Sequence, residues 1–185
     1  PIPMVSLGTT GTSLVSWSFA VDWADPSRSA VTGPTVLTVA AYTPSCGGGT
    51  CIAQPGTTTK LDSLGDRLMY RLSYRQRGDE GSLVAVQTVG IPADPASTAG
   101  ATTGIRWYEL RLSSADETIR LAQSGTWAPD GRYRWLPSIA ADRSGDIVVG
   151  YSLGDAESHP SLAVAGRLAG DPAGTLTRAE EIVAA

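Results

Sequence analysis

Two arginines in equivalent sequence contexts are the best candidates for chemistry in this chain. Arg67 lies within Asp66-Arg67-Leu-Met-Tyr70, and Arg134 directly follows Tyr133. Each arginine stands near the start of a segment of β-forming residues, which predicts equivalent positions on the first strand of a repeated unit. Two guanidinium groups that converge on one spot would bind an anionic ligand through paired hydrogen bonds, and Asp66, Tyr70 and Tyr133 would lie beside that ligand. The structural alternative is that each arginine ties neighbouring sheets together by hydrogen bonds.

The remaining polar residues do not complete a catalytic set. His159 is the only histidine and follows Glu157-Ser158 between two predicted strands. No Gly-x-Ser-x-Gly segment is present to expose a nucleophile, so we expect His159 to be an exposed loop residue. Pairs of aspartates lack the Asp-x-Asp-x-Asp-Gly pattern of a calcium loop, and we interpret them as turn caps rather than metal ligands. These pairs are Asp22 with Asp25, Asp62 with Asp66, and Asp142 with Asp146. We predict no metal and no other cofactor.

The two cysteines stand close together in Cys46-Gly-Gly-Gly-Thr-Cys51. Three glycines let the backbone turn back tightly enough for the two sulfur atoms to bond, which predicts a local disulfide. A Cys-x4-Cys zinc half-site is the alternative, but no histidine or second cysteine pair is near to complete it. A disulfide implies an oxidising compartment, so we expect an extracellular, secreted protein.

Composition narrows the class of protein. The chain has 185 residues, 42% of them apolar and 17% charged, with a net charge of −4. It can therefore build a core, and it has no basic surface to hold nucleic acid. No apolar run reaches the length of a membrane span. The 21 glycines and 12 prolines, with abundant threonine, serine and valine, are typical of a turn-rich β protein.

Short β-forming runs recur between turns, and the chain aligns with itself. The segment 66–127 matches 134–184, each reading as four antiparallel strands of which the second is almost wholly apolar. We expect a strand over Arg67–Arg75, a long loop over Gly90–Gly104, and either a strand or a short helix over Leu176–Val183. The segment 13–42 supplies two further strands, Leu14–Trp23 and Thr35–Tyr42, and 43–65 is a loop that holds the cysteines. We therefore predict a single all-β region over 1–185, made of about two and a half propeller blades. A β-sandwich is the alternative.

The incomplete ring implies a partner. Propellers close with about four to eight blades, so this number of blades leaves an unpaired strand edge and apolar faces exposed to water. We expect either the remainder of a longer propeller chain or a second copy to cover them.

Several motifs resemble the later part of large secreted bacterial β-propeller proteins, the sialidase-like or Asp-box (BNR) repeat family. The resemblance extends from about Ser13 to Leu176, and the residues that carry it are Phe19-Ala-Val-Asp-Trp23, Thr32-Gly-Pro-Thr35, Leu61-Asp-Ser-Leu-Gly-Asp-Arg-Leu-Met-Tyr-Arg-Leu72, Gly104-Ile-Arg-Trp-Tyr-Glu-Leu110, Arg134-Trp-Leu-Pro-Ser-Ile-Ala140 and Gly166-Arg-Leu-Ala-Gly-Asp-Pro172. The turn Asp142-Arg-Ser-Gly145 departs from the Ser-x-Asp-x-Gly-x-Thr-Trp box in spacing and lacks the Thr-Trp pair.

The resemblance implies a propeller and leaves two functions open. The first is an extracellular module for binding or assembly, because no complete catalytic set is visible. The second is a sialidase-type glycoside hydrolase that acts on anionic glycans. Such an enzyme requires an arginine cluster, a tyrosine nucleophile activated by a glutamate, and an aspartic acid that acts as the general acid. In either case a glycan is a possible ligand of Arg67 and Arg134.

Overall fold

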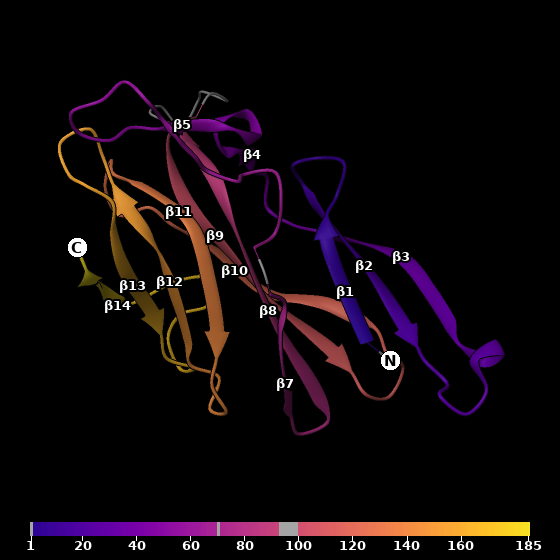
Figure 1. Ribbon diagram of the computed structural model, residues 1–185. Coiled ribbons are helices and arrows are strands. Elements are labelled where there is room, and N and C mark those ends of the chain that lie inside the picture. The colour runs from indigo at the N-terminus through magenta and orange to yellow at the C-terminus, as the bar shows by residue number, and fades with distance from the viewer. Residues whose placement is uncertain (1, 70, 93–99) are drawn as a thin grey trace.

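The computed structural model describes residues 2–69, 71–92 and 100–185. In it three large antiparallel sheets are stacked face to face in chain order (Figure 1). The N-terminal sheet has the order β1-β2-β3, from Ile2–Leu7, Ser13–Ala20 and Ala30–Thr38. The central sheet has the order β10-β9-β8-β4, with β7 also paired to β8; its strands are β4 (Thr43–Pro44), β7 (Ser73–Arg77), β8 (Glu80–Pro92), β9 (Gly100–Ser113) and β10 (Ile119–Trp127). The C-terminal sheet has the order β11-β12-β13-β14, from Tyr133–Ala141, Ile147–Gly154, Ser161–Arg167 and Arg178–Ala184.

The central sheet is apolar on both faces because a sheet covers each of them. Leu83 and Ala85 of β8 pack with the N-terminal sheet, in a core that also holds Leu14 and Leu37. Their neighbours on β8, such as Val84, face the other way into a second core formed with the C-terminal sheet. Successive residues of a strand point to opposite faces, so a strand covered on both sides becomes a nearly continuous apolar run. This explains why the second strand of the predicted unit is so apolar.

The prediction of an all-β chain built from antiparallel sheets is confirmed, and the C-terminal sheet has the four strands expected of a repeated unit. The last segment, which could also have been a helix, is strand β14. The segment from Arg67 to Arg75 was expected to be one strand, but β7 begins only at Ser73. Within the expected loop 90–104, β8 continues to Pro92 and β9 starts at Gly100, while residues 93–99 lie outside the described part of the chain.

We expected two strands from residues 13–42, and the N-terminal sheet has a third strand, which precedes them. Its additional strand β1 pairs with β2 along its whole length. β3 is followed along the chain by β4, which pairs with β8 at the same edge as β7. In the same way, β10 is followed by β11, the first strand of the C-terminal sheet. β3 therefore corresponds to β10 and β14, and the N-terminal sheet lacks only the first of the four strand positions.

The predicted disulfide joins Cys46 to Cys51, with a Cα–Cα distance of 5.4 Å. It closes the 3₁₀ turn η2 (Ser45–Gly48) onto β5 (Thr50–Ile52), which pairs with β6 (Leu61–Asp62). The covalent link thus pins a loop that lies against β8 and β9 of the central sheet.

The predicted turn caps are present on four of the aspartates singled out. Asp142 Oδ1 accepts the backbone N–H groups of Gly145 at 2.8 Å and Asp146 at 2.9 Å, and Gly145 has φ +95°. Asp22 and Asp62 accept backbone N–H groups in the same way, and so does Asp25, which caps the 3₁₀ turn η1 (Pro26–Arg28). A carboxylate that satisfies its own turn is the ordinary reason for such residues.

Candidate functional site

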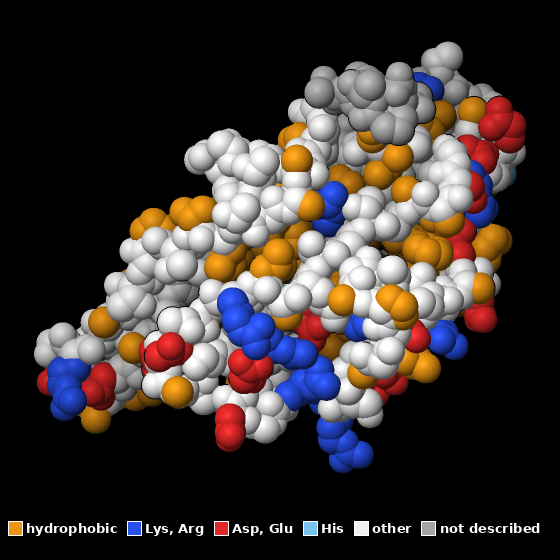
Figure 2. Space-filling model, turned by 180° about the vertical axis from the view of Figure 1, so that it is seen from behind, with side chains coloured by type: hydrophobic (Ala, Val, Ile, Leu, Met, Phe, Trp, Pro, Cys, Tyr) orange, Lys and Arg blue, Asp and Glu red, His pale blue; other side chains and the backbone are white. Residues whose placement is uncertain are grey.

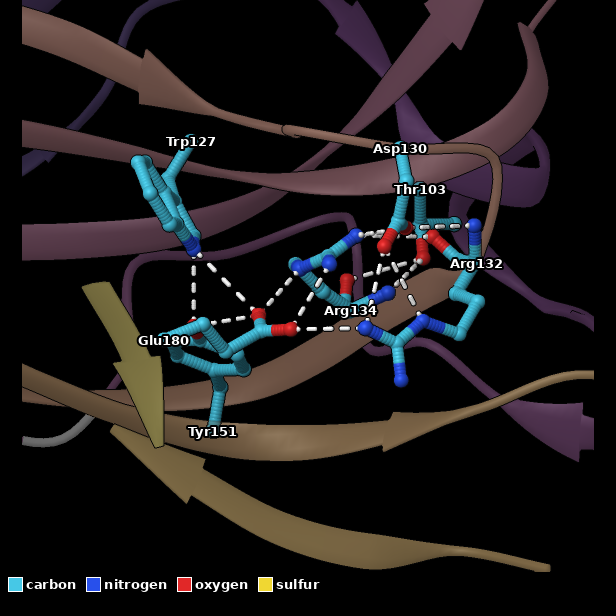
Figure 3. Close-up of polar contacts among 7 residues, drawn as sticks. All are labelled: Thr103, Trp127, Asp130, Arg132, Arg134, Tyr151 and Glu180. Atoms are coloured by element: carbon cyan, nitrogen blue, oxygen red, sulfur yellow. Dashed lines mark hydrogen bonds and ion pairs between the residues drawn. The ribbon is translucent and has the colours of Figure 1, made fainter. Parts of the chain in front are cut away.

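A buried polar cluster lies where the central and C-terminal sheets meet, and Arg134 of β11 is at its centre (Figure 3). Its side chain is 0% exposed. Nε and Nη2 donate to Glu180 Oε2 at 2.7 Å and Oε1 at 3.0 Å, a paired arrangement in which both carboxylate oxygens are used. Nη1 donates to Asp130 Oδ1 at 2.8 Å and to the Arg132 carbonyl oxygen at 3.2 Å. Four of the five guanidinium N–H groups therefore have acceptors within the protein.

The backbone of Arg134 is also fixed, by a side chain of the central sheet. The hydroxyl of Thr103 on β9 donates to the Arg134 carbonyl oxygen at 2.8 Å and accepts from the Arg134 N–H at 3.1 Å. A second guanidinium joins from the loop before β11, since Arg132 Nη2 donates to Glu180 Oε1 at 2.9 Å. The cluster thus fixes β11 against both β9 and β14.

Tyr151 and Trp127 complete the cluster from β12 and β10. The hydroxyl of Tyr151 donates to Glu180 Oε2 at 2.7 Å. Trp127 Nε1 in turn donates to the Tyr151 oxygen at 2.7 Å. Glu180 therefore receives hydrogen bonds from Arg134, Arg132 and Tyr151 and is the residue on which the cluster depends.

The charges in the cluster stabilise one another. The hydrogen bond from Arg134 holds the pKa of Asp130 well below its usual range. Burial raises the pKa of Glu180, but the hydrogen bonds from Arg134 and Tyr151 outweigh it and leave that pKa below its ordinary value. Burial, aided by the hydrogen bond to Glu180, raises the pKa of Tyr151 far above its ordinary value. Both carboxyl groups are ionised at neutral pH, and Tyr151 holds its proton.

The cluster contains the residue types that sialidase chemistry requires, but its side chains bind one another across the two sheets. We call this cluster the clamp. A nucleophilic tyrosine must reach its substrate, whereas Tyr151 is 3% exposed and its hydroxyl is hydrogen-bonded to both Trp127 and Glu180. A ligand carboxylate needs guanidinium donors that face solvent, whereas those of Arg134 are buried and paired. The contacts of the cluster hold two sheets together, which matches the structural alternative given above for Arg134.

The other residues proposed for anion binding lie elsewhere or outside the description. Asp66 and Arg67 form an ion pair at 2.7 Å with both side chains about half exposed, and the hydrogen bond from Arg67 lowers the pKa of Asp66. Tyr133 is half-buried at the start of β11, and Tyr70 lies outside the described residues. Among the described residues no hydrogen bond or ion pair joins Arg67 to the Arg134 cluster. A ligand shared by the two arginines stays a prediction.

Asp66 also borders a hollow of about 260 Å³ next to the disulfide loop. Tyr42, Gly48 and Leu7 of β1 line the same hollow. The neighbouring Arg67 has its guanidinium already paired with Asp66.

Sequence reasoning missed Glu180, Asp130 and Tyr151. Glu180 fell in a segment that could equally have been a helix, and only its place in a strand sends it inward, between outward-facing Ala179 and Glu181. The usable signal was a glutamate at an inward position of a strand, because a buried carboxylate requires a cationic partner.

A second candidate site is a hollow of about 550 Å³ on the outward face of the C-terminal sheet. Its floor is made of small and apolar side chains on the face that points away from the central sheet, and its rim is charged. The floor includes Ala140, Val148, Val164 and Gly166, and the rim includes Arg75, Asp142, Asp146, Arg178 and Glu181.

Comparison with protein-family models, curated proteins and solved structures found no match for this chain. In the described part of the chain no helix is long and apolar enough to span a membrane. Nor do the described residues contain a group of three or more histidine, cysteine, aspartate or glutamate side chains that could hold a metal ion.

Proposed function

We propose that this chain is a non-enzymatic, extracellular β-propeller module that works in binding and assembly through the outward faces of its two outer sheets. One observation carries the proposal: the central sheet is covered on both faces, whereas each outer sheet leaves an apolar face in contact with water. The disulfide supports an oxidising, extracellular location.

The outward face of the N-terminal sheet is the more apolar of the two. Ile2 and Met4 of β1 are each more than half exposed, and Val36 of β3 is 65% exposed. Their cross-strand partners on β2, including Phe19 and Trp17, share this face. Figure 2 shows apolar side chains along the end of the molecule that this sheet forms. Contiguous apolar surface of this kind marks an interaction site.

The outward face of the C-terminal sheet is the second such surface. Val148 of β12 is 49% exposed, and Leu162 of β13 is also about half exposed. Val148 pairs across the strands with Ala140 on one side and Gly166 on the other, so these residues form one row on the floor of the 550 Å³ hollow. A sheet face without charges across its centre is suited to packing against another sheet.

The proposal is tested by placing a charge in each face. Light scattering over a range of protein concentrations should show that the native chain associates. Val36→Asp and Val148→Asp should each weaken that association at least tenfold, because a buried unpaired carboxylate costs several kcal/mol. Thr58→Asp, in the exposed loop between β5 and β6, is the matched control and should leave association unchanged. A native chain that stays monomeric at every concentration, with a melting temperature that neither face substitution alters, would contradict the proposal.

Glycoside hydrolysis is the second candidate, and the presence of Tyr151, Glu180, Arg134 and Asp130 in one cluster favours it over other reactions. The burial of that cluster argues against it. A panel of chromogenic sialosides and other glycosides decides between the two functions. Turnover that is lost in Tyr151→Phe, which keeps the ring and removes only the hydroxyl, would overturn the non-enzymatic proposal.

A further inference from the structure

The loop between β10 and β11 contains a dipeptide with chemistry of its own. Asp130 is followed directly by Gly131, and this is the only Asp-Gly pair in the chain. The loop connects the central sheet to the C-terminal sheet, because β10 ends at Trp127 and β11 begins at Tyr133. A chemical change at Asp130 would therefore act on the connection between two of the three sheets.

An aspartate in front of a glycine reacts with its own backbone. The backbone nitrogen of the glycine attacks the carbon of the side-chain carboxyl group, so that a C–N bond forms and a C–O bond breaks. The proton of the nitrogen leaves with the hydroxyl as water, and a cyclic imide remains. When water then opens this ring at the backbone carbonyl, the chain continues through the former side chain, and the residue is an isoaspartate. Glycine favours the first step because it has no Cβ to hinder the approach.

The structure leaves this dipeptide open to solvent. The side chain of Asp130 is 42% exposed, and Gly131 is exposed as well. A Cβ added at Gly131 would meet no atom within 4 Å, so the loop is not packed against the rest of the protein at this residue. Water, which is the only co-reactant, therefore reaches the pair.

The clamp restrains the carboxylate that would react (Figure 3). Oδ1 of Asp130 accepts from the backbone N–H of Arg132 at 2.9 Å and from Arg134 Nη1 at 2.8 Å. Oδ2 accepts from Arg132 Nε at 3.0 Å and Nη2 at 2.9 Å. The hydrogen bond from Arg134 also holds the pKa of Asp130 well below its usual range, so the carboxyl group is ionised at neutral pH and its oxygen is a poorer leaving group. The contacts that place Asp130 in the clamp thus also slow its reaction.

We propose that Asp130 is a site of spontaneous conversion to isoaspartate, and that the conversion removes the part of the clamp that Asp130 supplies. In isoaspartate the carboxylate is bonded directly to the Cα atom, and the backbone between residues 130 and 131 is longer by one methylene group. The carboxylate therefore leaves the positions at which it accepts from Arg132 and Arg134. Nη1 of Arg134, on a fully buried guanidinium, loses its carboxylate acceptor, which destabilises the contact between the two sheets.

Conversion is measured on the whole folded chain. The chain is kept in mildly acidic buffer at body temperature for several weeks, labelled with a methyltransferase that is specific for isoaspartate, and mapped by mass spectrometry of its peptides. We expect the label mainly at Asp130. The chain has no asparagine, so deamidation cannot contribute to the signal.

Two variants and a control separate the roles of the glycine and of the hydrogen bonds. Gly131→Ala keeps the contacts of Asp130, places its Cβ in open space, and should slow conversion about tenfold or more. Arg132→Ala removes both hydrogen bonds to Oδ2 and should speed conversion about threefold or more. Arg67→Ala removes the comparable ion pair with Asp66 and should leave conversion at Asp130 unchanged.

The consequence for the clamp is tested on the converted chain after its separation by chromatography. It should unfold at a lower denaturant concentration than the unconverted chain, with faster hydrogen exchange in β11 and β14. Absence of the label at Asp130 in the native chain would overturn the site. Equal rates in the native chain and Arg132→Ala would overturn the restraint by the clamp, and equal stability of the converted and unconverted chains would overturn the effect on it. None of these outcomes bears on the proposed binding and assembly function, which fails or stands by its own test.

Discussion

The two interfaces inside this chain are held together in different ways. Between the central and C-terminal sheets, hydrogen bonds cross along the whole contact: Thr103 to the backbone of Arg134, Trp127 to Tyr151, and Arg75 and Arg77 to carbonyl oxygens around the β11–β12 turn. Among the described residues no hydrogen bond joins a strand of the N-terminal sheet to a strand of the central sheet. At that interface, Arg106 of β9 donates hydrogen bonds to the carbonyl oxygens of Ala40 and Ala41, which lie in the connection after β3.

The difference teaches how each contact is specified. Apolar burial is non-directional, so the N-terminal interface is defined by the shapes of Leu14, Leu83 and their neighbours. Hydrogen bonds to buried charges are directional and costly to lose, so the other interface has one favoured register. The central and C-terminal sheets are therefore joined by hydrogen bonds as well as by packing, and the N-terminal sheet is joined to the central sheet by packing.

The largest effect is expected from Glu180→Ala. The change leaves Arg134 buried without its main carboxylate and removes the acceptor of the Tyr151 hydroxyl. Loss of one partner of a buried ion pair costs about 3–5 kcal/mol, which should appear as a lower free energy of unfolding in denaturant titration. Glu181→Ala, the exposed neighbour on β14, is the control and should cost under about 0.5 kcal/mol. Equal effects of the two changes would mean that the cluster does not clamp the sheets.

The matching change in the N-terminal interface is Leu14→Ala. Leu14 of β2 is fully buried against the central sheet, and a cavity at such a site costs about 2–5 kcal/mol. Because packing alone attaches the N-terminal sheet, hydrogen exchange should speed up mainly in β1–β3, while the other two sheets stay protected. Glu180→Ala should show the opposite pattern, with faster exchange in β11–β14. Uniform exchange in both variants would show that the two interfaces unfold as one.

Much of the framework was predictable, and the site was not. Apolar runs such as Ser82–Val89 and Ile105–Leu112 were predicted as strands, because a strand that is buried on both faces is apolar at successive positions. β1 was not predicted because it contains Pro3 and prolines are unfavourable in strands, although Pro3 is tolerated where one edge of β1 is open. The strand expected over Arg67–Arg75 begins only at Ser73, since the expectation rested on a composition that resembles β11.

The Arg134 cluster shows the limit of sequence reasoning more sharply. The equivalence of Arg67 and Arg134 in sequence suggested equal roles, yet one is exposed and the other is fully buried. What separates them is Glu180, which lies 46 residues beyond Arg134 and meets it only after four strands have paired. A contact of that separation depends on the register of every strand between, which no local pattern specifies.

A smaller effect is expected from Thr103→Val, which keeps the side-chain shape and removes the hydroxyl between β9 and β11. The N–H and carbonyl groups of Arg134 would lose their partner, at a cost of about 1–3 kcal/mol. The neighbouring Thr102→Val is a close control, because the Thr102 hydroxyl is buried with no hydrogen-bond partner in the described structure. That control should leave stability unchanged or raise it. A loss of stability in Thr102→Val equal to that in Thr103→Val would assign the effect to burial rather than to the bridge between sheets.

The smallest effects are changes of stability with pH. In acid they come from the carboxyl groups of the clamp, and in alkali they come from buried tyrosines, Tyr108 at the N-terminal interface and Tyr151 in the clamp. The pKa values of Glu180 and Asp130 lie below their ordinary values of about 4, so in acid the unfolded chain takes up protons before the folded chain does. The stability of the clamp is therefore complete above about pH 5 and falls as pH is lowered. At the N-terminal interface, burial raises the pKa of Tyr108 to about 12, so its contribution is complete below pH 10 and is lost as pH rises through 12.

Two variants isolate these contributions in denaturant titrations. Between about pH 7 and pH 3, the native chain should lose more stability than Glu180→Gln, which keeps the side-chain shape but has no carboxyl group to protonate. Between about pH 9 and pH 11 it should lose more than Tyr108→Phe, which has no hydroxyl to ionise. Both losses are gradual, because folded Glu180 takes up its proton at a lower pH than Glu180 of the unfolded chain, and the high pKa of Tyr108 keeps most folded molecules neutral at pH 11. Acid sensitivity that Glu180→Gln leaves unchanged would place the decisive carboxylates outside the clamp, and the contrast between the two interfaces would then rest on packing alone.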